Sequence, residues 1–575
     1  MKPSTAKIKE AIRKWALQNA ITYKYQANVG AVLGKILAEL PELKEEAASL
    51  RKLVSEIVAE INAMPPDKQL DELKRIAPEL LEKKPKTKEK ELEALPNATK
   101  GKVVMRFAPS PSGPLHIGHA LVLSLNSEYC RLYDGKLILR IEDTNPENIY
   151  EPAYRMIPEE ANWLTKGNIA KVVFQSDRLH TYYDYAEKII AAGKGYVCTC
   201  NPDSFRELIA KKKACPCREL PIKEQLLRWD RMFSGYEPGE AVVRIKTDLN
   251  DPNPAMRDWP ALRINHTVHP RTGTSERVWP LMNFAVAIDD HELGITHTIR
   301  GKDHMDNAKR QSHIFDIFGW EKPTHLYFGR INFTGLELSS SATKALIAQG
   351  KYSGWDDIRL PFIAALRRRG YQPDAFIRYA IDIGISLADK SISAGDFFKA
   401  LDAHNREIVD KIANRYFFVE NPIKIEIANV PELSPRVELH PDFLERGFRE
   451  FIIEKSFYIS SEDFATIKPD TIYRLIGCLN FIKKGKRFVF DSASYDAFWK
   501  QHGKGNLHWL PADGPMASEL VKVEVIMADG SRLSGLGEPM LKNLKLGEIV
   551  QFERRFFARL DEKKKDMLIF WYLHK

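Results

Sequence analysis

His116 and His119 stand three residues apart at the start of a predicted helix, directly after a turn rich in proline, serine and glycine. Apolar patterning predicts a buried strand before this turn, over 102–108, and a helix after it, over 115–133. Residues three apart share one face of a helix. Free N–H groups and the helix dipole favour an anion at this turn, and imidazoles can donate to phosphate oxygens. Gly118, between the histidines, has no side chain, so a flat base could lie against the backbone.

Three charged residues stand where separate predicted strands end. Arg106 lies near the end of the strand before the histidine turn, Glu142 ends the next strand, and Arg300 ends a third. Ligands of open α/β sheets bind beyond the carboxyl ends of the strands, so these side chains are expected to converge. The alternative for each residue alone is a surface ion pair of little energetic weight.

Four cysteines form two closely spaced pairs, Cys198 with Cys200 and Cys215 with Cys217. Four thiolates are the number that tetrahedral zinc takes. In a reducing compartment a metal is favoured over disulfides. The spacing differs from the usual CxxC knuckle, and the alternative is a set of small buried residues.

Composition limits the class of protein. The 575 residues include 86 Lys+Arg against 77 Asp+Glu, a net charge of +9 that is compatible with a polyanionic partner without requiring one. The N-terminus has no apolar signal core, and no apolar run is long enough to span a bilayer. Six cysteines in this length do not indicate a disulfide scaffold. These features predict a soluble cytoplasmic protein with no membrane association.

The hydrophobic pattern predicts a multidomain chain built around a Rossmann-type α/β domain with an insertion. Helical periodicity dominates the first 83 residues, strand–helix alternation follows a charged linker, and short alternating strands predict antiparallel β-barrels at the end. The predicted segments are an N-terminal helical extension at 1–83, the linker at 84–101, the first half of the α/β domain at 102–195, the insertion at 196–265, the second half at 266–344, a helical domain at 345–411 and the β-barrel region at 412–575.

The fourteen residues from Arg106 to His119 resemble the HIGH signature of class I aminoacyl-tRNA synthetases, in the form typical of the glutamyl/glutaminyl branch. The resemblance covers roughly residues 100–575, and as a whole it points to the archaeal-type glutamyl enzymes. The predicted barrels are similar to those of archaeal and eukaryotic glutamyl enzymes and of glutaminyl enzymes, whereas bacterial glutamyl enzymes use helices in this region. It implies ATP with Mg²⁺, L-glutamate and tRNA(Glu) as substrates. Glutamyl-adenylate would form first and then pass glutamate to the 3′ end of tRNA. Whether tRNA(Gln) is also charged stays open.

The resemblance also implies roles for individual residues. Arg300 matches the position where glutamate enzymes keep an arginine, because a forked guanidinium suits a carboxylate better than a neutral amide. The implied sets are catalytic His116 and His119; ATP-binding Pro109, Gly118, Leu338, Ser339, Ser341 and Lys344; glutamate-binding Arg106, Ser110, Glu142, Asn283 and Arg300; and a structural zinc on Cys198, Cys200, Cys215 and Cys217.

The sequence departs from the family pattern at three positions. Glu337 and Ser340 stand where the KMSKS loop carries its lysines, so Lys344 is the remaining cation expected near the phosphates. Met282 stands where a tyrosine often contacts the substrate. Two alternatives therefore stay open: a glutaminyl enzyme, which Arg300 disfavours, and a non-catalytic RNA-binding paralogue, which the intact histidine pair disfavours.

The implied RNA surface has three parts. The insertion is the candidate acceptor-stem domain, the helical domain is the candidate stem-contact region, and the barrels are expected to recognise the anticodon. The N-terminal helices could contact the tRNA elbow or a protein partner. The basic residues considered for this surface are Lys211, Lys212, Lys213, Arg218, Arg228, Arg231, Arg367, Arg368 and Arg369.

Overall fold

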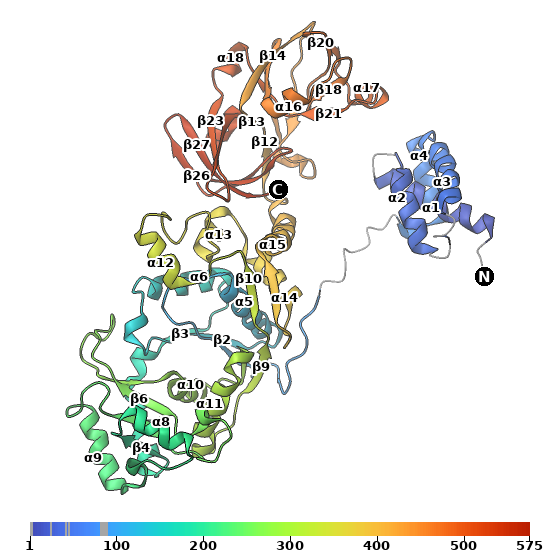
Figure 1. Cartoon of the computed structure of the whole chain (residues 1–575). Helices are drawn as coiled ribbons and strands as arrows, with labels where there is room; N and C mark the ends of the chain where they lie inside the picture. The colour runs from blue at the N-terminus through green and yellow to red at the C-terminus, as the bar shows by residue number, and fades with distance from the viewer. Residues whose placement is uncertain (1–3, 23–25, 41–42, 44–46, 81–89) are drawn as a thin grey trace. The chain divides into compact units, whose positions relative to one another are not determined.

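The computed structural model describes residues 4–22, 26–40, 43, 47–80 and 90–575, and the chain divides into two compact units, Met1–Glu91 and Leu92–Lys575 (Figure 1). The first unit is helical, as predicted. Ile12, Leu17 and Ile61 are fully buried in its core, whereas Ile8 and Trp15 of the same periodic pattern are only partly buried. Its helices are α1 Thr5–Thr22, α2 Val29–Glu39, α3 Ala47–Asn62 and α4 Pro66–Ile76. Residues 84–89 of the predicted linker lie outside the described residues.

None of the described helices combines the length and the apolar composition needed to cross a bilayer.

A five-stranded parallel sheet forms the centre of the described residues 92–575. Its order is β3-β2-β1-β8-β9, so the strand sequence reverses between β1 and β8. Such a reversal opens a crevice at the carboxyl ends of the two strands, where ligands of α/β sheets bind. The strands are β1 Val104–Phe107, β2 Lys136–Ile141, β3 Lys171–Phe174, β8 His297–Gly301 and β9 Thr324–Phe328, and the connecting helices are α5 Ile117–Leu132, α6 Ala153–Leu164, α7 Leu179–Ala191, α10 Met282–Glu292 and α11 Met305–Phe318.

The insertion forms a separate four-stranded antiparallel sheet, β4-β5-β6-β7. The alternation pattern assigned residues 266–344 to the second half of the α/β domain, but β7 within this range pairs with β6 of the insertion, because Trp279 is buried in the core of the insertion. Short apolar strands have the same sequence pattern in a parallel and in an antiparallel sheet. The pattern therefore could not show to which of the two sheets β7 belongs. The elements are β4 Gly195–Cys198, α8 Pro202–Ala210, α9 Ile222–Met232, β5 Val242–Ile245, β6 Pro260–Ile264 and β7 Val278–Pro280.

A mainly helical region follows the parallel sheet. The prediction of a helical segment at 345–411 missed one strand, β11, which pairs in parallel with β10. Its elements are β10 Ile331–Thr334, α12 Ser340–Ala348, α13 Ile363–Arg369, α14 Pro373–Ile383, β11 Lys390–Ser393 and α15 Ala394–Val409.

Two seven-stranded sheets make up the described C-terminal region, with orders β12-β25-β26-β27-β23-β24-β13 and β21-β18-β19-β20-β14-β17-β22. In each sheet the two end strands are neighbours in the chain: Phe417 alone separates β12 from β13, and two residues separate β21 from β22. Each sheet must therefore curl until its edges meet, which confirms the predicted barrel-like architecture. The pairs β12–β25, β23–β27, β14–β20 and β18–β21 run parallel; the other neighbouring pairs are antiparallel.

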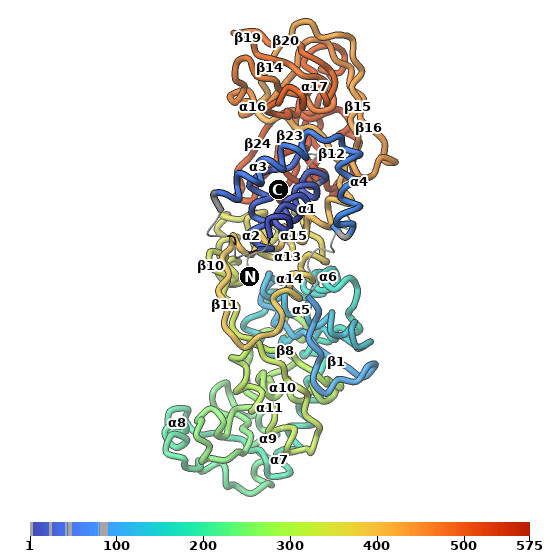
Figure 2. The backbone as a smooth tube through the Cα atoms, turned by 90° about the vertical axis from the view of Figure 1, so that its right-hand side faces the viewer, coloured from blue at the N-terminus to red at the C-terminus, as the bar shows by residue number. Residues whose placement is uncertain are grey.

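The strands of these two sheets are short. They are β12 Asn414–Tyr416, β13 Phe418–Glu420, β14 Pro422–Ala428, β17 Ser456–Ser460, β18 Ile472–Leu475, β19 Asn480–Lys484, β20 Arg487–Ser492, β21 Gly505–Leu507, β22 Leu510–Pro511, β23 Val521–Ile526, β24 Arg532–Gly537, β25 Ile549–Phe552, β26 Phe556–Lys564 and β27 Met567–His574. A small hairpin, β15 Arg436–Glu438 with β16 Phe448–Glu450, and the short helices α16 Ser461–Thr466, α17 Tyr495–Lys500 and α18 Gly514–Ala517 accompany them. Within this unit the insertion and the barrels lie at opposite ends of the parallel sheet in both views (Figure 2).

The arginine run at the end of α13 is largely structural. Arg369 is buried and donates to the backbone carbonyls of Tyr572 and Leu573, and Arg368 pairs with Asp561 on β26 at 2.7 Å. Arg367 is exposed. Two of the three arginines in this run, all of which were considered for an RNA surface, therefore hold the last strands of the barrel against α13.

Replacing Arg369 by leucine is expected to destabilise the protein by about 2–4 kcal/mol, because buried carbonyls lose their donors. Thermal or urea unfolding of the full chain measures this. Arg367→Ala is the matched control and should stay within about 0.5 kcal/mol of the parent chain. Equal stability of the two variants would contradict the structural role of Arg369.

Candidate active site

His116 and His119 lie together at the N-terminus of α5, with stacked rings 3.8 Å apart. The Nδ1 atom of His116 accepts from the backbone N–H of Gly118 at 3.1 Å, and Nδ1 of His119 accepts from the backbone N–H of His116 at 3.4 Å. A neutral imidazole that accepts at Nδ1 carries its proton at Nε2. Each ring therefore keeps one N–H donor for a ligand.

Both histidines are uncharged near neutral pH. Burial lowers the pKa of His116 to about 4, and burial together with the neighbouring His116 lowers the pKa of His119 well below its ordinary value. They can stabilise a phosphate by hydrogen bonding and not by net charge.

Gly118 has a role that the sequence analysis did not anticipate. A Cβ atom at this position would lie 2.9 Å from Cε1 of His116, so the ring of His116 packs directly over the glycine. In this structure an imidazole occupies the space where the sequence suggested that a base could lie.

The segment before α13 anchors the histidine turn. The backbone N–H of Ile117 donates to the carbonyl of Pro361, and the N–H of Ile363 donates to the carbonyl of Leu115 at 2.9 Å. His116 and Phe362 thus form an isolated antiparallel bridge.

The N-terminus of α12 faces the histidines across a cavity of about 590 Å³. Ser339 caps α12 by accepting from the N–H of Ala342, and Lys344 lies 5.1 Å from the ring centre of Tyr150. The residues lining this cavity include His116, His119, Ser340, Ser341 and Lys344. The described residues that line this cavity do not include the other members of the predicted ATP-binding set, which are Pro109, Gly118, Leu338 and Ser339.

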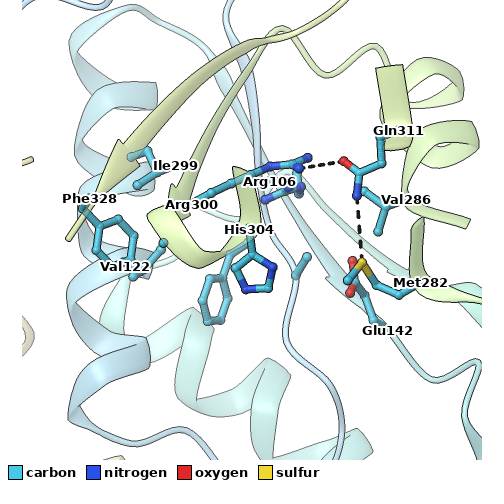
Figure 3. A pocket seen from close by; sticks show the side chains of 13 residues that line it. Arg106, Val122, Glu142, Met282, Val286, Ile299, Arg300, His304, Gln311 and Phe328 are labelled. Carbon is cyan, nitrogen blue, oxygen red and sulfur yellow. Dashed lines mark hydrogen bonds between the residues drawn. The ribbon is translucent and has the colours of Figure 1, made fainter. Parts of the chain in front are cut away.

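Arg106, Glu142 and Arg300 converge on a second cavity of about 200 Å³ at the carboxyl ends of β1, β2 and β8 (Figure 3). Met282 also lines it, at the position where the family often has tyrosine. Two residues of the predicted glutamate-binding set, Ser110 and Asn283, are not among the described residues that line this cavity. Ser110 is exposed.

The centre of this site is Asp290, a fully buried residue of α10 that the sequence analysis did not select. Its carboxylate lies 2.6 Å from Nη1 of Arg140, 3.2 Å from Nη2 of Arg300 and 3.4 Å from Nε of Arg106. Burial opposes ionisation, but the three guanidinium groups outweigh it and lower the pKa of Asp290 to about 2. Arg140 also donates to Glu142 at 3.0 Å, which joins all the charged groups of the cavity in one network.

Gln311 on α11 fixes the other side of Arg300. Its side-chain oxygen accepts from Nη1 of Arg300 at 2.6 Å, and its amide donates to Asn283 at 3.1 Å (Figure 3 shows the first contact). Asn283 therefore acts on the cavity through Gln311. Burial and the nearby Arg106 lower the pKa of Arg300 to about 10, which still leaves it charged at neutral pH.

A sequence signal for Asp290 existed. Asp289 and Asp290 follow the apolar run 284–288 inside one helix, and two adjacent acids on a buried segment require buried cations. Asp289 meets this requirement through Arg178 at 2.7 Å. Gln311 gave no comparable signal, because its importance depends on Arg300, which is its neighbour only in the fold.

The two cavities are neighbours. Phe107 lines the cavity of the arginines, and its ring contacts His119 edge-on with ring centres 6.0 Å apart. A ligand with a carboxylate in one cavity and phosphates in the other would pass beside this aromatic ring.

The four cysteines of the insertion come together, as predicted. The Sγ atoms of Cys198 and Cys215 are 3.9 Å apart, those of Cys200 and Cys217 are 3.7 Å apart, and all four lie within 4.8 Å of one another. Tetrahedral zinc with bonds of about 2.3 Å separates its sulfur ligands by about 3.8 Å. The spacing fits a zinc ion.

The fold and site have the form of a class I tRNA synthetase, and comparison with known proteins agrees. The family model described as tRNA synthetases class I (E and Q), catalytic domain, matches residues 102–397, and the corresponding anticodon-binding models match 413–492 and 506–561. The chain belongs to this family.

The relatives define a narrower group. The chain is 45% identical to the glutamate–tRNA ligase of Thermococcus kodakarensis, with 99% of this chain and 100% of that protein covered. It is 43% identical to the enzyme of that name from Methanothermobacter thermautotrophicus over 99% and 100% of the two chains, and 46% identical to that from Pyrococcus furiosus over 98% and 99%.

The contact between Gly113 and α12 gives a test of the phosphate-side cavity. A Cβ at Gly113 would lie 2.8 Å from both Cβ and Oγ of Ser340, so Gly113→Ala should push the two walls apart. We expect kcat/KM for ATP to fall by about 10²-fold, since small displacements of positioning groups have effects of this size.

The double variant Gly113→Ala/Ser340→Gly removes the clashing atoms and should recover at least about tenfold of this loss. Gly34→Ala is the control, because a Cβ there meets nothing within 4 Å. No recovery in the double variant would show that the contact is unimportant.

Proposed function

We propose that this chain is a glutamate–tRNA ligase, which activates glutamate with ATP and transfers it to the 3′ end of tRNA(Glu). The observation that carries the proposal is the convergence of Arg106, Glu142 and Arg300 on one cavity, beside the cavity of the two histidines. Relatives named glutamate–tRNA ligase, aligned over the whole chain, support it.

The charge of the arginine cavity suits glutamate. Arg106, Arg140 and Arg300 contribute three positive charges, and Glu142 and Asp290 contribute two negative charges. Asp289 also lies 3.8 Å from Arg140, but Arg178 balances its charge, so the net charge is +1. Zwitterionic glutamate has a net charge of −1 at neutral pH, whereas glutamine has none. Glutamate neutralises the cavity, while glutamine would leave one buried guanidinium without a counter-charge.

The charged side chains of the cavity divide between the two ends of the amino acid. Glu142 accepts from the ammonium group, and Arg106 and Arg300 donate to the side-chain carboxylate. The α-carboxylate is then directed toward Phe107 and the histidine cavity. It is already ionised at neutral pH, so its attack on the α-phosphorus of ATP needs no general base.

The histidine cavity supplies neutral donors and one cation to the phosphates. The Nε2–H groups of His116 and His119 donate to phosphate oxygens, and Lys344 supplies the positive charge that Glu337 and Ser340 lack. Mg²⁺ would accompany ATP and would supply positive charge to its phosphate groups.

The RNA partner is assigned by region. The insertion receives the acceptor stem, and the two barrel-like sheets receive the anticodon, because unpaired bases stack well on aromatic faces of small barrels. The protein works in the cytoplasm with its tRNA, and the helical unit Met1–Glu91 is available to the tRNA elbow or to a protein partner.

The four cysteines, Cys198, Cys200, Cys215 and Cys217, would hold a structural zinc ion in the insertion. Besides the sulfur spacing, the guanidinium of Arg228 donates to Sγ of Cys217 at 3.4 Å and the backbone N–H of Thr199 donates to the same atom at 3.5 Å. Donors directed at sulfur favour the thiolate that zinc binds. Bound zinc would tie β4 to the segment before α9.

Charging assays with purified tRNA(Glu) and tRNA(Gln), each with glutamate and with glutamine, test the function directly. Glutamate on tRNA(Glu) is the expected product. Glutamine on tRNA(Gln) alone would instead identify a glutaminyl enzyme. Absence of ATP–pyrophosphate exchange with either amino acid and either tRNA would identify a non-catalytic RNA-binding protein.

Arg300→Ala is expected to reduce kcat/KM for glutamate by about 10²- to 10³-fold, because a buried donor to the substrate carboxylate is lost. The KM for ATP should not change, which separates this effect from misfolding. Lys309→Ala on the exposed face of α11 is the control. Unchanged glutamate kinetics in Arg300→Ala would remove the basis for the assigned specificity.

The purified protein is expected to contain about one zinc per chain, measured by atomic spectroscopy. Cys217→Ser should lose the metal, because a tetrahedral site loses affinity with any of its thiolates. Cys478→Ser is the matched control: this cysteine is buried and lies outside the cluster. A metal-free parent chain would contradict the zinc site.

A further inference from the structure

Glu160 on α6 lies directly behind the histidine turn, and neither the sequence motifs nor the proposed chemistry uses it. The residue is only 4% exposed. Its Oε2 atom accepts a hydrogen bond of 2.7 Å from the backbone N–H of Leu115, the residue before His116.

Leu115 is therefore held on both sides of its backbone. Its carbonyl accepts from the N–H of Ile363, and its N–H has Glu160 as the partner. Leu115 itself is fully buried. A buried N–H that loses its acceptor is costly, and the local backbone moves to relieve it.

The carboxyl group of Glu160 is uncharged near neutral pH. Its Oε1 atom is buried and has no hydrogen-bond partner among the described residues. Burial raises the pKa of Glu160 to about 8; the backbone N–H of Leu115 and the charge of Arg367 oppose the rise, and Glu159 adds to it. The charged groups that line the adjoining cavity of about 480 Å³ are Arg155 and Glu159 on α6, Asp356, Arg367 and Arg368 near and on α13, and Arg559 on β26.

We propose that Glu160 is a positioning residue for the adenylation step: its carboxyl group, which accepts from the Leu115 N–H, fixes that peptide and so aims His116 at the phosphates. The inference rests on the proposed function. Ionisation of the same group places an unpaired charge behind the turn and disturbs that position.

Three variants test this through ATP–pyrophosphate exchange in the presence of tRNA(Glu). Glu160→Gln keeps an acceptor oxygen for Leu115, whereas Glu160→Leu removes it. Glu159→Gln is the matched control, because Glu159 is exposed and forms an ion pair with Arg155 at 3.4 Å. At pH 7 we expect kcat to fall by about 10- to 100-fold in the leucine variant, with the KM for glutamate within about twofold. The glutamine variant and the control should stay within about threefold of the parent.

The pH profile separates positioning from simple structural support. An acid with a raised pKa is neutral below that value and ionises as the pH rises through it. The parent and Glu159→Gln should therefore lose kcat as pH rises above about 8, whereas Glu160→Gln, which cannot ionise, should not. If Glu160→Leu fails to fold, the comparison of the pH profiles of the parent and Glu160→Gln still tests the inference.

Identical pH profiles for the parent and Glu160→Gln, or full kcat in a folded Glu160→Leu, would overturn the inference while leaving the proposed function intact. A parent chain with no exchange activity under any tRNA condition would contradict the proposed function, and the inference with it.

Discussion

The carboxylate of Asp290 is the group on which the amino-acid cavity depends. Arg106, Arg140 and Arg300 come from three strands of the parallel sheet, and their mutual repulsion in a buried site would drive them apart without a shared counter-charge. Asp290 comes from α10. Its ionised state is secured by these same cations, so the acid and the arginines stabilise one another. The resulting cavity keeps one surplus positive charge, which is available to a substrate carboxylate.

A second constraint acts on the phosphate side. Leu115, Ile117 and the segment before α13 exchange backbone hydrogen bonds, so the histidine turn is paired with chain almost 250 residues away. Because the loop backbone is already fixed by these hydrogen bonds, it needs little reorganisation when the ligand binds. This is the condition for effective electrostatic stabilisation of a transition state. The neutral histidines fit this arrangement. They donate hydrogen bonds without needing the desolvated positive charge that burial opposes.

Much of the architecture could be predicted from periodicity. The strand and the helix on either side of the histidine turn, β1 and α5, lie within a few residues of the predicted ranges 102–108 and 115–133, because a run of turn residues separates two apolar elements there. Arg106, Glu142 and Arg300 could be placed together because the rule for strand ends is topological and needs no contact information. Gln311 and Glu160 could not be found in this way. Their importance depends on Arg300 and Leu115, neighbours that only the folded chain supplies.

The arginine run 367–369 is a second case in which the sequence alone could not assign a role, because here the sequence pattern suggested a function that the fold does not give to the whole run. As sequence it is a basic patch, and three adjacent cations suggest a polyanion. On a helix, however, adjacent residues point about 100° apart, so a run of three cannot lie on one face. Arg369 is directed into the interface with β27, Arg368 reaches Asp561, and Arg367 remains exposed. Arg368 and Arg369 fix the sheet that begins with β12 relative to α13. They therefore also fix this sheet relative to the histidine turn, which the segment before α13 anchors. A rigid connection of this kind sets the distance between the region proposed to read the anticodon and the site proposed to activate glutamate.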